Sequence, residues 1–513
     1  MSFSLLSTLL PLLLGPAFFM MPNVGVTLPN QAPPDPVADA ARFETVAKQL
    51  DLGGVLYGYV SVDGDLSAIG AYVKSFMDGM RPLAHDVRHF ENGIKVEDVG
   101  QIPQVDVPAI LKVSGLDAIS AVGFSSKSVE GGFRNKSYLY TPKGRRGLLR
   151  MLGGESKPFD VVKLAPAGSD FVFEQDLNLK VVYESIQEAL VAGMGEQGAL
   201  FKAMMDGAVN QPLPPPIPFT MEKVLADLDT QIAVIIDADL DKKITLTHPD
   251  AEGLQSPLMR AAVLIDELGW VADELAKILE PMLARPPIGM TPAKIVRNPN
   301  WVGVQLAIEP EQYSVMDAEV LELFGSTNPV LVHHRPSGNL VLASGFEFAE
   351  NLFIPKPNLE DDPDFRKTMV GLPMKGTAIT YASPALFSAL REVLESAIDV
   401  EDLGGSESLI LNTFLKLFLP KNVRGEGSVT TNSKDGILTV SNSAHSHKAN
   451  IVSSAASPLL MAITAGFGAL QPVLMMDDVE AVHDHEGHDH EQFLELEQLL
   501  DPGLKKPIPQ RGD

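Results

Sequence analysis

A cluster of histidines and carboxylates lies near the C-terminal end of the chain, in residues 483–491 (HDHEGHDHE). It contains four imidazole and four carboxylate side chains within nine positions. Neutral imidazole is a good ligand for Zn²⁺, Ni²⁺ and Cu²⁺, and the neighbouring carboxylates raise the local concentration of cations. The sequence therefore predicts a divalent-metal site formed by His483, His485, His488 and His490. A solvated acidic linker is the alternative interpretation of the same run.

The residues needed for covalent or acid–base catalysis form no recognisable sequence motif. The chain has no cysteine, which excludes a thiolate nucleophile, a disulfide and a cysteine-ligated metal. The sequence also lacks a nucleophile elbow, a P-loop and a zinc-protease helix. We expect no catalytic or cofactor-binding residue. A hydrolase with a dispersed active site stays open as an alternative, because a Ser-His-Asp triad is defined by geometry and not by order along the chain.

Two weaker patterns resemble metal sites. Residues 237–241 (DADLD) resemble the start of a calcium-binding loop, but Lys242 and His248 stand where such a loop needs glycine and glutamate. A hairpin turn is therefore predicted there. His333 and His334 lie in an expected strand, where consecutive side chains point to opposite faces, so the two cannot easily bind one ion.

The charge of the chain restricts its partners. The net charge is −26 over 513 residues, a length that fits about two to four domains. Nucleic acid and anionic membrane surfaces repel such a protein at long range, so neither is expected as a partner. The densest basic patch is residues 143–146 (KGRR) together with Arg150, and we predict a solvated loop there because no aromatic side chain interleaves it.

Two uncharged segments suggest export or membrane contact. The first charged side chain is Asp35, and the apolar run before it predicts a secretory signal peptide within a leader of residues 1–40. An uncleaved anchor stays open as an alternative. Residues 449–476 are apolar, uncharged and long enough to cross a bilayer, and residues 451–476 are the candidate membrane helix. An acidic, His-rich tail follows in residues 477–513. We therefore expect an exported protein of the periplasm or cell envelope, with a membrane anchor as an option.

Two stretches, residues 164–190 and 372–398, align without a gap at an offset of 208 positions. Their apolar positions coincide first at a period of two and then of three to four, as in a strand followed by an amphipathic helix. The aligned pairs are Leu164 with Leu372, Gly168 with Gly376, Phe171 with Ile379, Phe173 with Tyr381, Leu179 with Phe387, Val182 with Leu390, Ile186 with Leu394, and Leu190 with Ile398. The sequence thus predicts an α+β fold of two similar repeated modules, residues 41–255 and 301–448, joined by a linking helix in residues 256–300. Each module should be an antiparallel sheet packed by helices on one face.

Alternating apolar residues and turn signals predict the individual elements. The expected hairpins are 121–129 with 133–141, 232–236 with 244–247, 330–334 with 340–343, and 427–431 with 437–440. The expected helices are 177–193, 257–284 and 384–398, and a further strand is expected at 301–308.

The order of hairpin, helix, Leu-Pro loop, strand, helix and closing hairpin resembles a group of uncharacterised bacterial envelope proteins with a duplicated α+β body. The Leu-Pro loops are residues 164–166 (LAP) and 372–373 (LP), and the resemblance covers residues 50–445. It implies an exported α+β protein. It supplies no activity and no functional residue.

Together these features predict a non-enzymatic exported envelope protein whose duplicated body binds a partner protein or an apolar ligand. A cleft between the two halves is the expected position of that ligand. The alternatives are the handling of Zn²⁺, Ni²⁺ or Cu²⁺ by the His-rich tail and a hydrolase with a dispersed active site.

Overall fold

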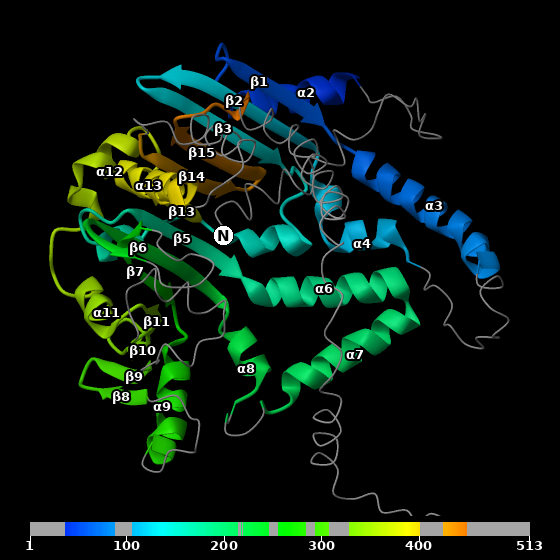
Figure 1. The fold of residues 1–513 in the computed structure, drawn as a ribbon. Helices are drawn as coiled ribbons and strands as arrows, with labels where there is room; N and C mark the ends of the chain where they lie inside the picture. Colours follow the sequence, from blue (N-terminus) through cyan, green and yellow to red (C-terminus); the bar gives the residue numbers. More distant parts are fainter. Residues whose placement is uncertain are drawn as a thin grey trace, which may run out of the picture. The chain divides into compact units, whose positions relative to one another are not determined.

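The computed structural model describes residues 36–87, 105–213, 217, 219–245, 255–283, 293–306, 328–400 and 424–448. Within these residues, thirteen strands form one antiparallel sheet in the order β1-β2-β3-β15-β14-β13-β5-β6-β7-β11-β10-β9-β8 (Figure 1). The strands are β1 (Leu56–Ser61), β2 (Ala121–Val129), β3 (Gly132–Tyr140), β5 (Phe171–Asn178), β6 (Asp229–Thr245), β7 (Gln255–Ile265), β8 (Ala293–Arg297), β9 (Trp301–Leu306), β10 (Val330–His334), β11 (Asn339–Ala343), β13 (Ala378–Ala382), β14 (Glu426–Ser433) and β15 (Gly436–Ser443). Two short strands, β4 (Lys157–Pro158) and β12 (Lys375–Gly376), pair as a separate two-stranded sheet.

Helices and 3₁₀ turns connect these strands. The α-helices are α2 (Pro36–Ala47), α3 (Asp65–Val87), α4 (Val107–Val113), α5 (Val161–Leu164), α6 (Leu179–Met194), α7 (Glu196–Asn210), α8 (Met221–Ala226), α9 (Gly269–Leu283), α11 (Phe346–Leu352), α12 (Pro363–Thr368) and α13 (Pro384–Val400). The 3₁₀ turns are η1 (Leu116–Ala118), η2 (Gly147–Leu152) and η4 (Leu359–Asp361).

The sheet brings together strands that are far apart in the sequence. At its centre β5 pairs with β13, and Val172 lies opposite Tyr381. On one side of this pair β15 lies against β3, and on the other side β7 lies against β11. The closing hairpin of the second expected module therefore pairs with the first hairpin of the first module, and β7, from the expected linking segment, pairs with the first hairpin of the second module.

The predicted α+β class and the antiparallel sheet packed by helices are confirmed. The strands of both expected modules, however, belong to one sheet, and the duplication itself is not confirmed. The pairing register of the two central strands, β5 and β13, disagrees with the duplication as aligned. Phe171 of β5 lies opposite Ala382 of β13, so these two side chains point to the same face of the sheet. Ile379 is three residues from Ala382 and so points to the face opposite Phe171, although the ungapped alignment makes Phe171 and Ile379 equivalent.

Helices cover both faces of the sheet. On one face Val172, Ile235 and Val341 are fully buried in the largest apolar cluster, together with side chains of α5, α11 and α12. Leu340, the neighbour of Val341 along β11, points to the other face and packs against Ala272 of α9. Each fully buried aliphatic side chain contributes about 1.5–3 kcal/mol, so these two layers hold the helices on the sheet.

Two predicted elements are wrong in the middle of the chain. The range 257–284, expected as one helix, contains the strand β7 followed by the helix α9. The expected hairpin at 232–247 is one long strand, β6, which continues through a bulge between Asp239 and Lys243. The acidic stretch that resembled a calcium-binding loop is therefore part of a strand, in which Asp237 forms an ion pair with Arg260 of β7.

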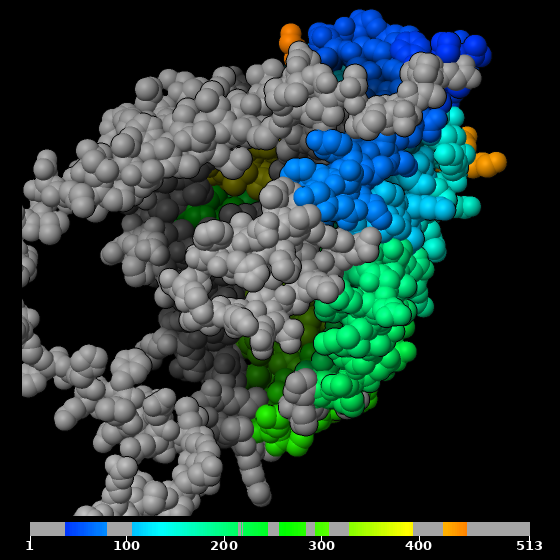
Figure 2. Space-filling view, turned by 90° about the vertical axis from the view of Figure 1, so that its right-hand side faces the viewer, coloured from blue at the N-terminus to red at the C-terminus, as the bar shows by residue number. Residues whose placement is uncertain are grey.

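Helix α6 does not pack on a sheet as predicted. It contacts α4, α7 and η2, and its Ile186 side chain, expected in the core, is 44% exposed. α6 and α7 form part of the molecular surface, coloured green in Figure 2. The matching helix of the second half, α13, does contact β6 and β7 of the sheet.

Several predicted segments lie outside the described residues. These include most of the leader at 1–40, the apolar run at 449–476 and the tail at 477–513. Among the described residues, none of the helices combines the length and the apolar character that a bilayer span requires.

Candidate functional site

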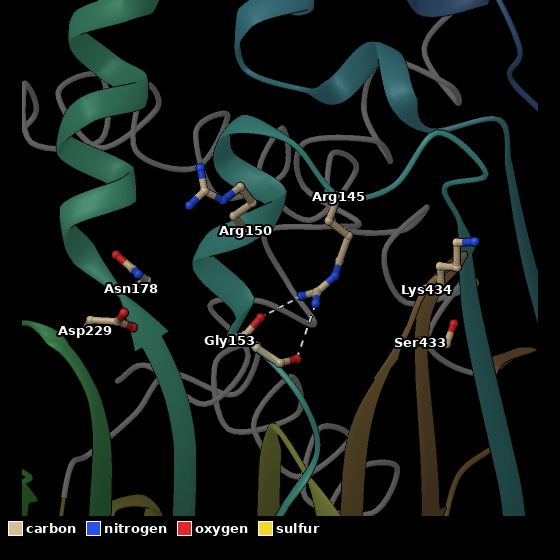
Figure 3. A pocket seen from close by; sticks show the side chains of 8 residues that line it. Arg145, Arg150, Gly153, Asn178, Asp229, Ser433 and Lys434 are labelled. Atoms are coloured by element: carbon tan, nitrogen blue, oxygen red, sulfur yellow. Dashed lines mark hydrogen bonds between the residues drawn. The ribbon is translucent and has the colours of Figure 1, made fainter.

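A cavity of about 410 Å³ opens beside one end of the central strands (Figure 3). Its lining residues are Arg145, Arg150, Gly153, Gly154, Asn178, Asp229, Ser433 and Lys434. They come from η2 and its flanking loops, from the junction of β5 and α6, from the start of β6, and from the turn between β14 and β15. The last of these belongs to the second half of the chain, so both halves contribute to the cavity.

The β14–β15 hairpin places two of the lining residues by its tight turn. Ser433 pairs with Gly436, which leaves Lys434 and Asp435 as the two residues of the turn. Asn432, just before this turn, donates from Nδ2 to the carbonyl oxygen of Leu152 at 2.9 Å. This contact fixes the hairpin tip against the loop that follows η2.

The loop after η2 needs glycine at position 153. Gly153 has a φ of +79°, a region that side chains other than glycine rarely adopt, and a Cβ there would lie 2.5 Å from Cβ of Asp176. Arg145 holds the loop by donating from Nη1 to the Gly153 carbonyl at 2.7 Å and from Nη2 to the Gly154 carbonyl at 3.2 Å. These bonds appear as dashed lines in Figure 3.

Positive charge dominates the cavity. Three of its lining side chains are cations, those of Arg145, Arg150 and Lys434, and one is an acid, Asp229. Among the described residues, none of these four side chains forms an ion pair with another. Burial lowers the pKa of Arg145 below its usual value, because the charged guanidinium is partly removed from water. In an acidic protein, three neighbouring cations without an ion-pair partner among the described residues create a local positive potential that attracts anions.

The N-terminus of α6 adds to this field. Asn178 caps the helix by accepting a hydrogen bond from Val181 N–H at 2.9 Å, and it also lines the cavity. A helix N-terminus carries a partial positive charge, which stabilises anions near the first turn. Figure 3 shows Asn178 where the strand passes into the helix, beside Asp229.

The basic patch at 143–146 with Arg150, predicted as a solvated loop, is thus partly correct. Lys143 and Arg146 are exposed, whereas Arg145 is half-buried and lines the cavity with Arg150. Lys434 could not be predicted as a neighbour of this patch, because the turn that carries it is almost three hundred positions away along the chain. The pairing of β15 with β3 and the hydrogen bond from Asn432 to Leu152 bring the two segments together.

The predicted metal ligands His483, His485, His488 and His490 lie outside the described residues, so the metal site stays a prediction. Within the described part of the chain, no group of three or more histidine, aspartate and glutamate side chains could hold a metal ion.

His333 and His334 point to opposite faces as expected from their place in one strand. His333 Nδ1 lies 2.9 Å from Asp273 of α9, whereas His334 Nδ1 lies 2.8 Å from Ser337 in the following turn. The His334 ring also packs on Phe353, with ring centroids 3.8 Å apart. Both histidines therefore connect the sheet to its covering layers.

One serine–histidine pair approaches the geometry that a hydrolase requires. Ser137 Oγ of β3 lies 3.2 Å from Nε2 of His447. Burial lowers the pKa of His447, which favours the neutral ring. However, the backbone N–H of His447 also donates to Ser126 Oγ at 2.9 Å. Together these contacts anchor the segment after β15 to the first hairpin. We assign the pair to this structural role.

Comparison with protein-family models, with curated proteins and with solved structures found no match for this chain.

Proposed function

We propose that this chain is a non-enzymatic binding protein of the cell envelope whose cavity takes a small anionic ligand. One observation supports the proposal above all others: three cations from both halves of the chain, Arg145, Arg150 and Lys434, surround a cavity of about 410 Å³ without an ion-pair partner among the described residues. A volume of this size is typical of small-molecule sites.

An anionic ligand fits this cavity better than the apolar ligand expected from the sequence. Arginine and lysine side chains form charge-assisted hydrogen bonds to phosphate and carboxylate groups, which are stronger than neutral ones. The cations stand on a fixed framework, since the loop carrying Gly153 is bonded both to Arg145 and to the β14–β15 hairpin. A site formed in advance loses little conformational entropy on binding.

Charge reversal at the cavity tests the proposal. Calorimetric titration of the full chain with inorganic phosphate and with citrate should detect binding to the native protein. Arg150→Glu and Lys434→Glu should each weaken it at least about tenfold, because a hydrogen bond to a charged group contributes about 1.5–3 kcal/mol. Both side chains are exposed, so neither change should unfold the protein.

Lys143→Glu is the matched control. It makes the same change of charge in the loop before η2, but Lys143 does not line the cavity. Its effect should be limited to the small, salt-screened change that a distant surface charge produces. If all three variants weakened anion binding equally, the affinity would depend on net charge alone, and a specific site would be contradicted.

The envelope location is part of the proposal and rests on the uncharged N-terminal sequence before Asp35. Cell fractionation followed by N-terminal sequencing tests it. We expect the chain in the periplasmic or membrane fraction, and recovery of an intact N-terminus from the cytosol would contradict export.

A further inference from the structure

We propose that the ligand carries a hydroxyl-bearing body beside its anionic group, as a phosphorylated sugar or polyol does. This inference rests on the proposed function and concerns the same cavity. It starts from the side chains that the anion itself does not require, Asp229 and Asn178. In Figure 3 these two lie on one side of the cavity, and Ser433 and Lys434 lie on the other.

Asp229 and Asn178 are held next to each other by the sheet. They are direct cross-strand partners at the ends of β6 and β5. The Oδ1 atom of Asn178 already accepts from Val181 N–H, and the Nδ2 group of the amide is available as a donor to a ligand. The ionised carboxylate of Asp229 can only accept.

A neighbouring donor and acceptor match the chemistry of a hydroxyl group. A hydroxyl can accept from Asn178 Nδ2 and donate to the Asp229 carboxylate at the same time. An ammonium group would suit Asp229 but would face the amide donor of Asn178. A second anionic group would be repelled by Asp229. The pair therefore selects a neutral, hydroxyl-bearing part of the ligand.

The cations of the cavity suit a phosphate ester. In Figure 3 Lys434 lies across the cavity from Asp229 and Asn178, whereas Arg150 lies on the same side as these two residues. Arg150 and Lys434 have no ion-pair partner among the described residues, and a phosphate monoester carries a charge of about −1.5 to −2 at neutral pH. A phosphate group by itself fills only a small part of about 410 Å³. The remaining space extends toward Asp229 and Asn178, where the sugar hydroxyls are recognised.

Calorimetry on the full chain with three probes tests the inference: inorganic phosphate, glucose 6-phosphate and glucose. Glucose 6-phosphate should bind the native protein at least about tenfold more tightly than inorganic phosphate, the effect of one hydrogen bond to a charged group. Asp229→Asn should remove most of this advantage. It should leave the affinity for inorganic phosphate unchanged or slightly higher, because a repelling charge is lost.

Asp435→Asn is the matched control. Asp435 stands beside Lys434 in the hairpin turn and does not line the cavity, so its loss should change the affinity for both anions by the same small factor. Equal affinity for phosphate and glucose 6-phosphate would overturn this inference and leave the proposed function intact. Stronger glucose 6-phosphate binding by Asp229→Asn would also overturn it. Failure of both anions to bind the native protein would overturn the proposed function itself.

Discussion

Glu174 places a carboxyl group inside the core of the protein, where only 3% of the residue is exposed. It lies on the face of β5 that also carries Val172. Its Oε2 atom accepts a hydrogen bond from Val161 N–H at 2.6 Å. Burial raises the pKa of Glu174 to about 7, and the hydrogen bond from Val161 opposes this rise. The nearby acids Asp160 and Asp176 raise it further.

This raised pKa predicts a stability that falls as the pH rises. The folded protein holds the proton on Glu174 up to about pH 7, whereas the unfolded chain releases it near 4.5. The stabilisation is therefore fully present below 4.5 and is lost as the pH rises through 7, a change of about 3 kcal/mol. In Glu174→Gln this loss should be absent. Urea denaturation at pH 5 and pH 8 measures the difference between variant and native protein.

Glu184→Gln is the control for this prediction. Glu184 is exposed on α6, so its replacement should change the free energy of unfolding by less than about 0.5 kcal/mol at either pH. If Glu174→Gln follows the native protein at both pH values, Glu174 does not titrate between them.

At the scale of single residues, the sequence predicted what alternation along a strand determines. His333 and His334 were expected on opposite faces and lie there. It did not predict that Glu174 would be buried or that Arg145 and Lys434 would line one cavity. Burial of an acid and proximity across the sheet depend on strand pairing, which the local pattern of one segment does not contain.

At the scale of elements, turn chemistry made the hairpins predictable. The glycines around residue 131 mark the β2–β3 turn, and the Pro-Ser-Gly turn at 336–338 marks the β10–β11 turn. The strand β7 was missed because its apolar end, residues 261–265 (AAVLI), cannot be distinguished from a buried helix segment by periodicity. The strand β6 was missed because its charged bulge has the composition of a turn.

The cap of α13 connects this helix to the sheet. Ser383 Oγ accepts from Leu386 N–H at 2.9 Å and donates to Asp170 Oδ1 at 2.6 Å. Burial raises the pKa of Asp170, and the hydrogen bond from Ser383 opposes this rise. Loss of the hydroxyl would therefore affect both the helix end and a buried carboxyl group of the neighbouring strand.

Ser383→Ala should lower the free energy of unfolding by about 2–4 kcal/mol. About 1 kcal/mol is the usual cost of a lost N-cap, and about 1–3 kcal/mol follows from leaving a buried polar group without its partner. Ser388→Ala, on the exposed side of the same helix, is the control and should cost less than about 0.5 kcal/mol. Chemical denaturation of the two variants checks the prediction, and equal effects would refute the role of the cap.

At the scale of the whole molecule, the sheet interleaves the two halves of the chain. β3 pairs with β15 and β7 pairs with β11, so neither half contains all the neighbours of its own strands. The sequence predicted the class of the fold but not this pairing, because contacts over such separations leave no local pattern. The duplication stays a prediction. The pairing register of β5 and β13 disagrees with the ungapped alignment.

The His-rich tail provides the last prediction, which concerns the full chain. Removal of residues 477–500 deletes His483, His485, His488 and His490, and should abolish Zn²⁺ binding measured by calorimetry at pH 7.5. Binding by the native chain should weaken strongly at pH 5.5, because imidazoles protonate near ~6.5 and then cannot ligate a metal. A chain with amides in place of the four neighbouring carboxylates should bind Zn²⁺ more weakly but still lose affinity at low pH. Unchanged binding by the deleted chain would exclude the tail as the metal site.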